Sequence, residues 1–180
     1  MPETIDLLLL GAGQLLTCGN GEKGPRRGGA LSDPGMIKNG AVAAAGGRIF
    51  AIGPRDAVLR AVDGMEVSMT LDAGGRVVMP GWVDPHTHAV FAGYRPDEYE
   101  ARIRGDSYLD IEKSGGGIKR SVRELRATAE GDLFEKSRRR LLRMLEEGVT
   151  TLEIKSGYGL DLESEMKTLR VIKRLGEETP

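Results

Sequence analysis

The second half of the chain alternates between patterns typical of strands and of helices, and this order limits the fold more than any other feature. An apolar run at residues 77–83 and a β-branched run at residues 149–154 each predict a strand. Residues 132–147 repeat apolar side chains every three or four positions, and a second helix is predicted from Asp161 to Gly176. Strand, helix, strand, helix is the repeating unit of a parallel α/β architecture.

Each predicted helix has one face that we expect to be buried. Gly148 suits the position just past the end of the first helix. The first face consists of Leu133, Phe134, Ser137, Leu141, Leu142 and Leu145, and the second of Leu162, Met166, Leu169 and Ile172. The charged run at residues 137–140 is most simply the solvated side of the first helix.

The first part of the chain carries strand and turn patterns. Apolar runs at residues 5–10, 41–45 and 48–52 predict strands, the last two joined by a glycine turn. Residues 19–35, rich in glycine, proline and charge, predict a long surface loop. We therefore expect two domains: part of a small β-sandwich at residues 1–78, and an α/β domain at residues 79–180.

Composition excludes several functional classes. The 26 Lys and Arg residues balance 27 Asp and Glu residues, so no basic excess attracts nucleic acid. The single cysteine, Cys18, cannot form an internal disulfide or a cysteine-rich metal cluster. The N-terminus is acidic, unlike that of a signal peptide, and no apolar run approaches the roughly 20 residues that span a bilayer. We expect a cytoplasmic protein without membrane or nucleic-acid partners.

The only two histidines of the chain lie one residue apart, at His86 and His88. In an extended strand, alternate side chains point to the same face, and these would be roughly 6.5–7 Å apart at Cα. Imidazole is a favoured ligand for zinc, iron, copper and nickel. The pair therefore predicts half of a metal site, with ordinary backbone-bonded histidines as the alternative.

The predicted topology places a second group of polar residues beside this pair. Both strands of a parallel unit point the same way, so residues 155–159 would follow the second strand at the edge where His86 and His88 follow the first. In a (β/α) barrel this edge carries the active site. Tyr158 would then face the metal from a loop that Gly157 and Gly159 make flexible.

These motifs resemble the amidohydrolase superfamily and, within it, the imidazolonepropionase family. The superfamily signal is the run at residues 80–88. The narrower signals are residues 91–95, the glycine-rich residues 114–118 and, most distinctively, residues 148–163. The resemblance covers residues 79–175 closely and the first domain loosely.

The resemblance implies the start of a (β/α)8 amidohydrolase barrel and a composite β-sandwich built from both chain ends. It implies hydrolysis of 4-imidazolone-5-propanoate to N-formimidoyl-L-glutamate, a step of histidine degradation, by attack of metal-bound hydroxide on the ring carbonyl. One zinc or iron ion is implied, with His86 and His88 among its ligands. Arg95 and Tyr158 fall at substrate-binding positions, joined by Tyr108. A guanidinium such as that of Arg95 can bind a substrate carboxylate through two hydrogen bonds.

The chain also departs from the family pattern. It holds no third histidine, and no carboxylate matches the late aspartate of the family. We therefore expect an incomplete, inactive N-terminal part of a longer enzyme, and a homodimer is left open. The alternatives are another amidohydrolase acting on a cyclic amide, of the hydantoinase, dihydroorotase or aminohydrolase type, and a non-catalytic truncated remnant. On residues alone, Arg95 is better explained as a solvated loop arginine, and Glu153 and Lys155 as an ion pair.

Overall fold

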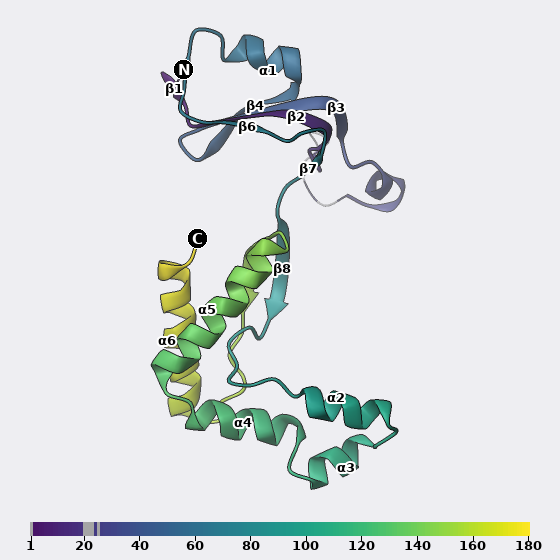
Figure 1. Cartoon of the computed structure of the whole chain (residues 1–180), viewed down its shortest axis with the longest axis vertical. Coiled ribbons are helices and arrows are strands. Elements are labelled where there is room, and N and C mark those ends of the chain that lie inside the picture. Colours follow the sequence, from purple (N-terminus) through teal and green to yellow (C-terminus); the bar gives the residue numbers. More distant parts are fainter. Residues whose placement is uncertain (1, 20–23, 25) are drawn as a thin grey trace. The chain divides into compact units, whose positions relative to one another are not determined.

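The computed structural model describes residues 2–19, 24 and 26–180. The chain divides into two units, Met1–Pro80 and Gly81–Pro180, and each is described by itself (Figure 1). Strands dominate the first unit, whereas the second combines parallel strands with helices, so the α/β class predicted from the sequence is confirmed. Among the described residues, no helix has the length and hydropathy that a bilayer span requires.

The first unit is built on a five-stranded sheet in the order β4-β3-β2-β6, in which β7 also pairs with β2. A separate two-stranded pair joins β1 to β5. The strands are β1 (Thr4–Ile5), β2 (Leu7–Leu16), β3 (Met36–Ala45), β4 (Arg48–Pro54), β5 (Glu66–Val67), β6 (Thr70–Asp72) and β7 (Val77–Val78).

The hairpin between β3 and β4 is the one that the sequence predicts. Gly46 and Gly47 at its tip have φ values of +57° and +71°, a combination that a two-residue turn of this type requires and that glycine adopts without strain. The helix that follows, α1 (Arg55–Ala61), was not predicted. It buries Val58 against one face of the sheet, where Leu8 and Ala43 also lie.

The other face of this sheet is apolar and open. Leu7, Leu9 and Val42 alternate along their strands with the residues that face α1, and they line a cavity of about 230 Å³. Ile49 and Ile52, on β4, border the same cavity and are exposed. A sheet with two apolar faces is expected in a sandwich, but the sandwich itself stays a prediction.

The predicted surface loop at residues 19–35 falls partly outside the described residues, at positions 20–23 and 25. Within the described part, a short 3-10 helix at Gly28–Ser32 is exposed. The ends of the loop are joined, because the backbone N–H of Thr17 donates to the carbonyl of Gly35 over 3.1 Å.

The strand predicted at residues 77–83, with a kink at its Pro-Gly pair, is instead two separate strands. The run is split between β7, which pairs within the first unit, and β8 (Trp82–Thr87), which pairs within the second. Pro80 lies between them and cannot donate a hydrogen bond to a ladder. At Gly81 a Cβ atom would lie 2.1 Å from the Thr150 hydroxyl, so this close approach requires glycine.

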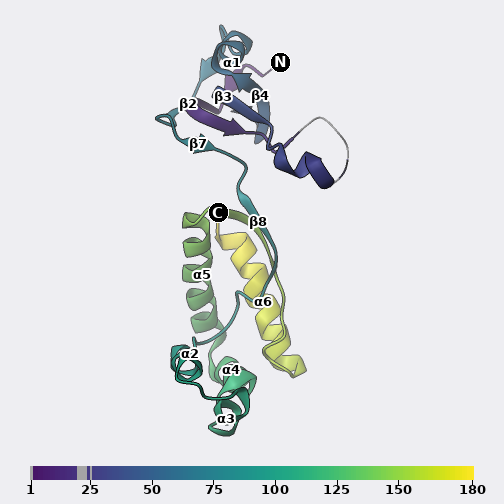
Figure 2. The same cartoon turned by 90° about the vertical axis from the view of Figure 1, so that its right-hand side faces the viewer.

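The second unit pairs β8 in parallel with β9 (Val149–Ile154), and two long helices cover one face of the pair. These helices, α5 (Glu130–Glu146) and α6 (Leu162–Glu178), lie side by side (Figure 2). Leu152 and Ile154 of β9 pack against the helical core. Strand, helix, strand and helix thus follow in the predicted order.

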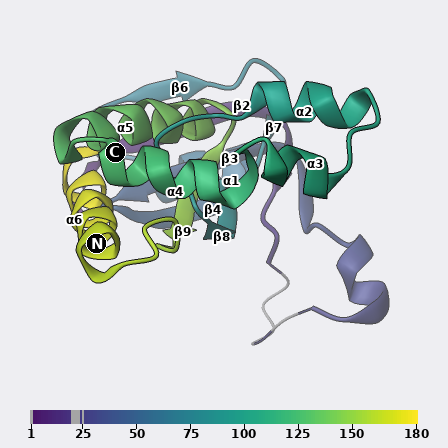
Figure 3. The ribbon, with the colours of Figure 1, turned by 90° about the horizontal axis from the view of Figure 1, so that it is seen from below.

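The segment between β8 and α5 forms three shorter helices that were not predicted. They are α2 (Pro96–Ile103), α3 (Tyr108–Lys113) and α4 (Gly117–Ala127), with α2 and α3 side by side (Figure 3). Ser107 begins α3 with a capping box, since its hydroxyl accepts the Asp110 N–H over 3.2 Å while the Asp110 carboxylate accepts the Ser107 N–H.

The ends of the long helices follow the predicted caps at two of three positions. Gly148 lies just past the end of α5 with a φ of +93°, and the Asp161 carboxylate accepts the Ser164 N–H at the start of α6 over 2.7 Å. The predicted stop at Gly176 is wrong. The helix continues to Glu178, whose carboxylate forms an ion pair with Arg174 over 2.6 Å.

The buried face was predicted correctly for most of α5 but not for α6. Leu133, Phe134, Ser137 and Leu141 of α5 are buried as expected, whereas Leu142 is half-buried and Leu145 is 37% exposed. Along α6, however, the predicted face is largely open: Leu162 is 81% exposed, and Met166 and Leu169 are each 45% exposed. The buried stripe consists instead of Ser164, Thr168, Val171 and Leu175. Thr168 can be buried because its hydroxyl donates to the Ser164 carbonyl, leaving no unpaired donor.

Phe134 should be a major source of stability for the second unit. Its ring is fully buried, and the Arg174 guanidinium lies 3.7 Å from the ring centroid. We expect Phe134→Ala to lower the free energy of unfolding by about 3–5 kcal/mol through loss of buried area and a residual cavity. Guanidinium unfolding followed by the fluorescence of Trp82, the only tryptophan, would measure it. Leu145→Ala, at a partly exposed position of the same helix, is the control, and an equal loss there would contradict the prediction.

Candidate metal site

His86 and His88 lie at the carboxyl end of β8, as their alternation predicted. His86 is within the strand and exposed, whereas His88 follows its last residue and is half-buried. Their ring centroids are 5.5 Å apart and the rings are inclined at 62°. The two imidazoles therefore form one cluster on one side of the strand end.

Tyr158 joins this cluster from the second strand. Its ring centroid lies 5.1 Å from that of His88, and the ring also packs against the core beneath α5 and α6. The strand ends are aligned because the Lys155 N–H donates to the Thr87 carbonyl over 2.8 Å. The structure thus brings together three of the five predicted site residues.

His88 has a ring nitrogen that is suited to binding a ligand. Its Nδ1 atom is buried and has no hydrogen-bond partner among the residues that the structure describes. Leaving such an atom unpaired is unfavourable, so it fits a side chain that binds a metal or substrate through its ring. The loop backbone approaches the ring closely, since a Cβ atom at Gly157 would lie 3.3 Å from the His88 Cε1 atom.

That the two histidines form half of a metal site stays a prediction. Within the described ranges of the chain, no three histidine, cysteine or acidic side chains are grouped so that they could hold a metal ion. Asp84 is on the same strand, but its carboxylate accepts the backbone N–H of His86 over 3.3 Å, as in a local turn.

Glu153 and Lys155 form the ion pair that the sequence predicted. The hydrogen bond from Lys155, together with its positive charge, lowers the pKa of the Glu153 carboxyl, and His86 adds a weaker effect of the same sign. Lys155 therefore neutralises this carboxylate beside the candidate site.

The other two predicted residues lie together in a different part of the second unit. Arg95 precedes α2 and forms an ion pair with Glu98 over 3.1 Å. Glu98 also accepts the N–H of Gly117 over 2.9 Å, and the Tyr108 hydroxyl would lie 3.8 Å from a Cβ atom at Gly117. In the part of the chain that the structure describes, neither Arg95 nor Tyr108 contacts the histidines, and Tyr108 is 57% exposed.

Arg140 holds the segment that follows His88. Its guanidinium lies 3.4 Å from the Phe91 ring centroid, donates to the Tyr94 hydroxyl over 3.0 Å and also donates to the Ala89 carbonyl. The interpretation of residues 137–140 as a solvated surface is therefore wrong for Arg140. For Ser137 there were two conflicting predictions from the sequence, and the structure supports the buried one.

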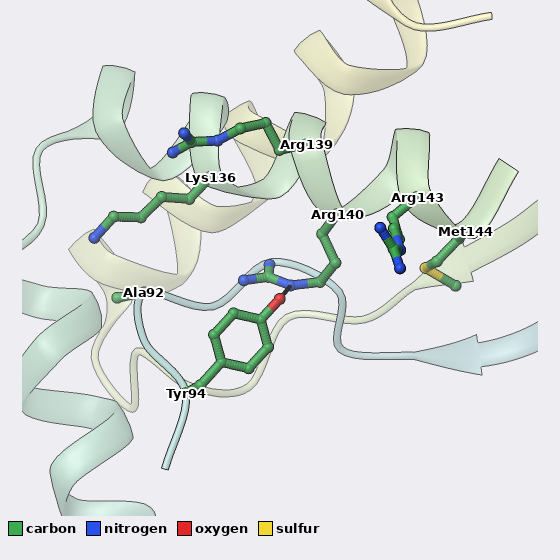
Figure 4. Close-up of a pocket in the computed structure, with 7 residues that line it drawn as sticks. All are labelled: Ala92, Tyr94, Lys136, Arg139, Arg140, Arg143 and Met144. Carbon is green, nitrogen blue, oxygen red and sulfur yellow. Dashed lines mark hydrogen bonds between the residues drawn. The ribbon is translucent and has the colours of Figure 1, made fainter. Parts of the chain in front are cut away.

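A cavity of about 530 Å³ lies beside Arg140 and is bordered by cations (Figure 4). Its lining consists of Ala92, Tyr94, Lys136, Arg139, Arg140, Arg143 and Met144. None of the five predicted site residues is among them. Arg140 points across the cavity to Tyr94, so part of its positive charge is already engaged by the loop.

Glu165 is a residue of the site that sequence reasoning missed. From the first turn of α6, its carboxylate accepts the backbone N–H groups of Gly157, Gly159 and Leu160 over 2.7, 2.9 and 2.8 Å. An acidic residue soon after a glycine-rich loop, in the first turn of a helix, was the available signal.

The Tyr158 loop, residues 156–161, is therefore not the flexible segment that its glycines suggested. Gly159 is needed for close packing, since a Cβ atom there would lie 2.7 Å from the Cβ of Ser164. From α4, Arg126 donates to the Gly159 carbonyl over 2.7 Å and pairs with Asp161 over 2.8 Å. The loop is thus held through its N–H groups by one helix and through a carbonyl by another.

The carboxyl of Glu165 should control the loop as pH changes. Burial raises its pKa, but hydrogen bonds from Leu160, Gly159, Gly157 and Ser156 together outweigh burial and leave the pKa below the ordinary value of 4.5. The stabilisation is therefore complete above about pH 4.5 and is lost as pH falls through the lower folded-state pKa. The amide chemical shifts of Gly157, Gly159 and Leu160 should titrate together below 4.5. Glu165→Gln should abolish this step, and its persistence in that variant would refute the assignment.

The chain is similar over nearly its whole length to known proteins, although no family model matches it. It is 46% identical to the imidazolonepropionase of Symbiobacterium thermophilum over 98% of this chain and 41% of that protein. It is also 46% identical to the imidazolonepropionase of Bacillus velezensis, over 100% of this chain and 41% of that protein.

Solved structures with the same fold are amidohydrolases of greater length. An adenosine deaminase from Xanthomonas campestris with bound zinc has a TM-score of 0.59 and 18% identity, over 97% of this chain and 33% of that one. A guanine deaminase from Bradyrhizobium japonicum has a TM-score of 0.52 and 17% identity, over 93% of this chain and 32% of that one. At such identities the likeness is one of fold alone.

The relatives and the predicted family agree. The chain spans about two-fifths of the length of the curated relatives that it matches. The motifs at residues 80–88 and 148–163 predict the same family. The chain is similar in sequence to one part of the imidazolonepropionases.

Proposed function

We propose that the chain is part of a metal-dependent hydrolase that opens 4-imidazolone-5-propanoate to N-formimidoyl-L-glutamate. One observation carries the proposal: His86, His88 and Tyr158 gather where two parallel strands end, in a chain 46% identical to imidazolonepropionases. Cyclic amides are hydrolysed at C–N bonds, and the adenosine and guanine deaminases of similar fold are named for removing amino groups, which also breaks a C–N bond.

His86 and His88 would hold one zinc or iron ion, with the remaining ligands supplied by residues outside these 180. The unpartnered Nδ1 of His88 and the zinc found in the adenosine deaminase of similar fold support a metal here. Such an ion would supply an activated water and polarise a carbonyl. The strand holds both imidazoles on one side. Among the described residues, the buried Nδ1 of His88 has no hydrogen-bond partner that a metal would have to displace.

The substrate would be a small molecule with a carboxylate side chain. Tyr158 can donate a hydrogen bond from its hydroxyl to a polar group of a ring bound beside His88. Arg95 would bind the carboxylate of the substrate. Its ion pair with the Glu98 carboxylate is an interaction of the same chemical kind. Tyr108 would close the same region near Gly117.

The proposed architecture is a (β/α)8 barrel that begins at residue 79 and a composite sandwich that includes residues 1–78. The parallel order of β8 and β9, with α5 and α6 on one face, supports the barrel. The open apolar face of the first sheet supports the sandwich. Leu162, Met166 and Leu169 form an apolar stripe on α6 that a neighbouring helix of the barrel would cover.

Zinc binding to this chain should depend on both histidines. We expect weak, saturable binding by the wild type. Loss of a residue that only supports a metal ligand weakens metal binding by roughly 10- to 100-fold. We expect His86→Ala and His88→Ala each to weaken zinc binding by more than this. Isothermal titration with zinc would measure this. Glu153→Gln is the control, because Lys155 already occupies that carboxylate; unchanged binding in both histidine variants would place the metal elsewhere.

The activity can be tested in a chimera. This chain would replace the matching segment of the Symbiobacterium thermophilum imidazolonepropionase, to which it is 46% identical. We expect the metal-loaded chimera to hydrolyse 4-imidazolone-5-propanoate, and His88→Ala to abolish turnover. A folded, metal-loaded chimera that hydrolyses hydantoin or dihydroorotate, but not imidazolonepropanoate, would contradict the proposed substrate.

A further inference from the structure

We propose that Glu165 is a positioning residue that fixes the Tyr158 side chain beside His88. Glu165 does not touch either ring, and it acts through the backbone of the Tyr158 loop. This role rests on the proposed function, since the position of Tyr158 matters for chemistry only if Tyr158 faces the substrate.

The first support is the placement of the hydrogen bonds around Tyr158. The N–H groups of Gly157 and Gly159, on either side of Tyr158 in the chain, both donate to the Glu165 carboxylate. One side chain therefore restrains the backbone both before and after the tyrosine. Hydrogen bonds to an ionised acceptor are shorter and roughly twice as strong as those between neutral groups.

The second support is that Glu165 lies on a helix and that both of its carboxylate oxygens accept hydrogen bonds from the loop. It lies in the first turn of α6, directly after the cap formed by Asp161. One carboxylate oxygen accepts from Gly157, and the other accepts from both Gly159 and Leu160. A glutamine has only one such oxygen, so it would direct an NH2 group toward at least one backbone donor.

The third support is the glycine chemistry of the loop. Gly157 has a φ of +135°, which side-chain-bearing residues rarely adopt, and its backbone lies against the His88 ring. Two glycines would leave a free loop with many conformations. The carboxylate selects one of them, in which the Tyr158 and His88 centroids are 5.1 Å apart.

The alternative is that packing alone places Tyr158. Its ring packs against the buried core of the second unit, and this contact does not involve Glu165. Removing the carboxylate separates the two explanations, because the apolar contact would remain while the backbone restraint is lost.

The test is nuclear magnetic resonance of the full 180-residue chain and of its Glu165→Gln, Glu165→Asp and Glu163→Gln variants. Glu163→Gln makes the same chemical change two residues earlier, in the same helical turn. The measurements are the nuclear Overhauser effect between the Tyr158 and His88 rings and the amide exchange rates of Gly157, Gly159 and Leu160. Trp82 fluorescence on unfolding establishes that each variant is folded.

In Glu165→Gln we expect the ring-to-ring effect to fall to a small fraction of its wild-type size. The three loop amides should exchange about 10- to 100-fold faster, as expected for loss of hydrogen bonds to a charged group. Glu165→Asp keeps the charge on a shorter side chain and should recover part of both signals, whereas Glu163→Gln should match the wild type. The Ser164 amide, bonded to Asp161, is an internal reference that should not change.

An unchanged ring-to-ring effect in folded Glu165→Gln, with or without faster exchange, would overturn the proposal and assign the placement of Tyr158 to packing. If Glu165→Gln does not fold, Glu165→Asp decides the question by the same two signals. These readouts need neither metal nor turnover. Failure of the chimera to hydrolyse imidazolonepropanoate would therefore count against the proposed function while leaving the role of Glu165 to be judged separately.

Discussion

Hydrogen bonds between β8 and β9 join parts of the chain that are far apart in sequence. The Thr87 hydroxyl, for example, donates to the carbonyl of Glu153, 66 residues away. The ladder begins where the Trp82 N–H donates to the Gly148 carbonyl over 2.8 Å and ends where the Lys155 N–H donates to Thr87 over the same distance. Because the strands are parallel, their carboxyl ends coincide. The approach of Tyr158 to the histidines depends on this alignment.

A charged side chain on a long helix holds each of the segments that follow the two strands. The two side chains have opposite charges. After β8, a cation on the next long helix, Arg140, donates to the Ala89 carbonyl and stacks on Phe91. After β9, an anion on the next long helix, Glu165, accepts three backbone N–H groups. In each case one charged side chain satisfies backbone groups that no ladder reaches, and it ties an irregular segment to a rigid helix.

Much of the second unit could be predicted because its signals are local. The period of α5, the β-branched run of β9 and the cap at Asp161 depend on neighbouring residues only. The buried face of α6 was mistaken because burial depends on which elements are present to cover a stripe, and polar Thr168 can be buried once its hydroxyl is paired.

Only part of the site could be predicted, because only some of its signals are local. The alternation of His86 and His88 follows from strand geometry, and Tyr158 follows from the parallel order. Arg140 and Glu165 have the sequence signature of solvated helix charges, and their partners lie in loops whose path the sequence does not specify. The five residues expected from the family therefore fall into two groups in space, with Arg95 and Tyr108 near Gly117.

The location of the histidines at a strand end also connects ligand binding to folding. His86 belongs to β8 and His88 follows it directly, so a ligand that holds both rings in the folded chain does not find them so arranged in the unfolded chain. By mass action, a ligand at 100 times its dissociation constant adds about 2.7 kcal/mol to the free energy of unfolding. Two-stranded pairs are marginally stable alone. A ligand bound to both histidines would thus also stabilise the pairing of the parallel strands that carry them.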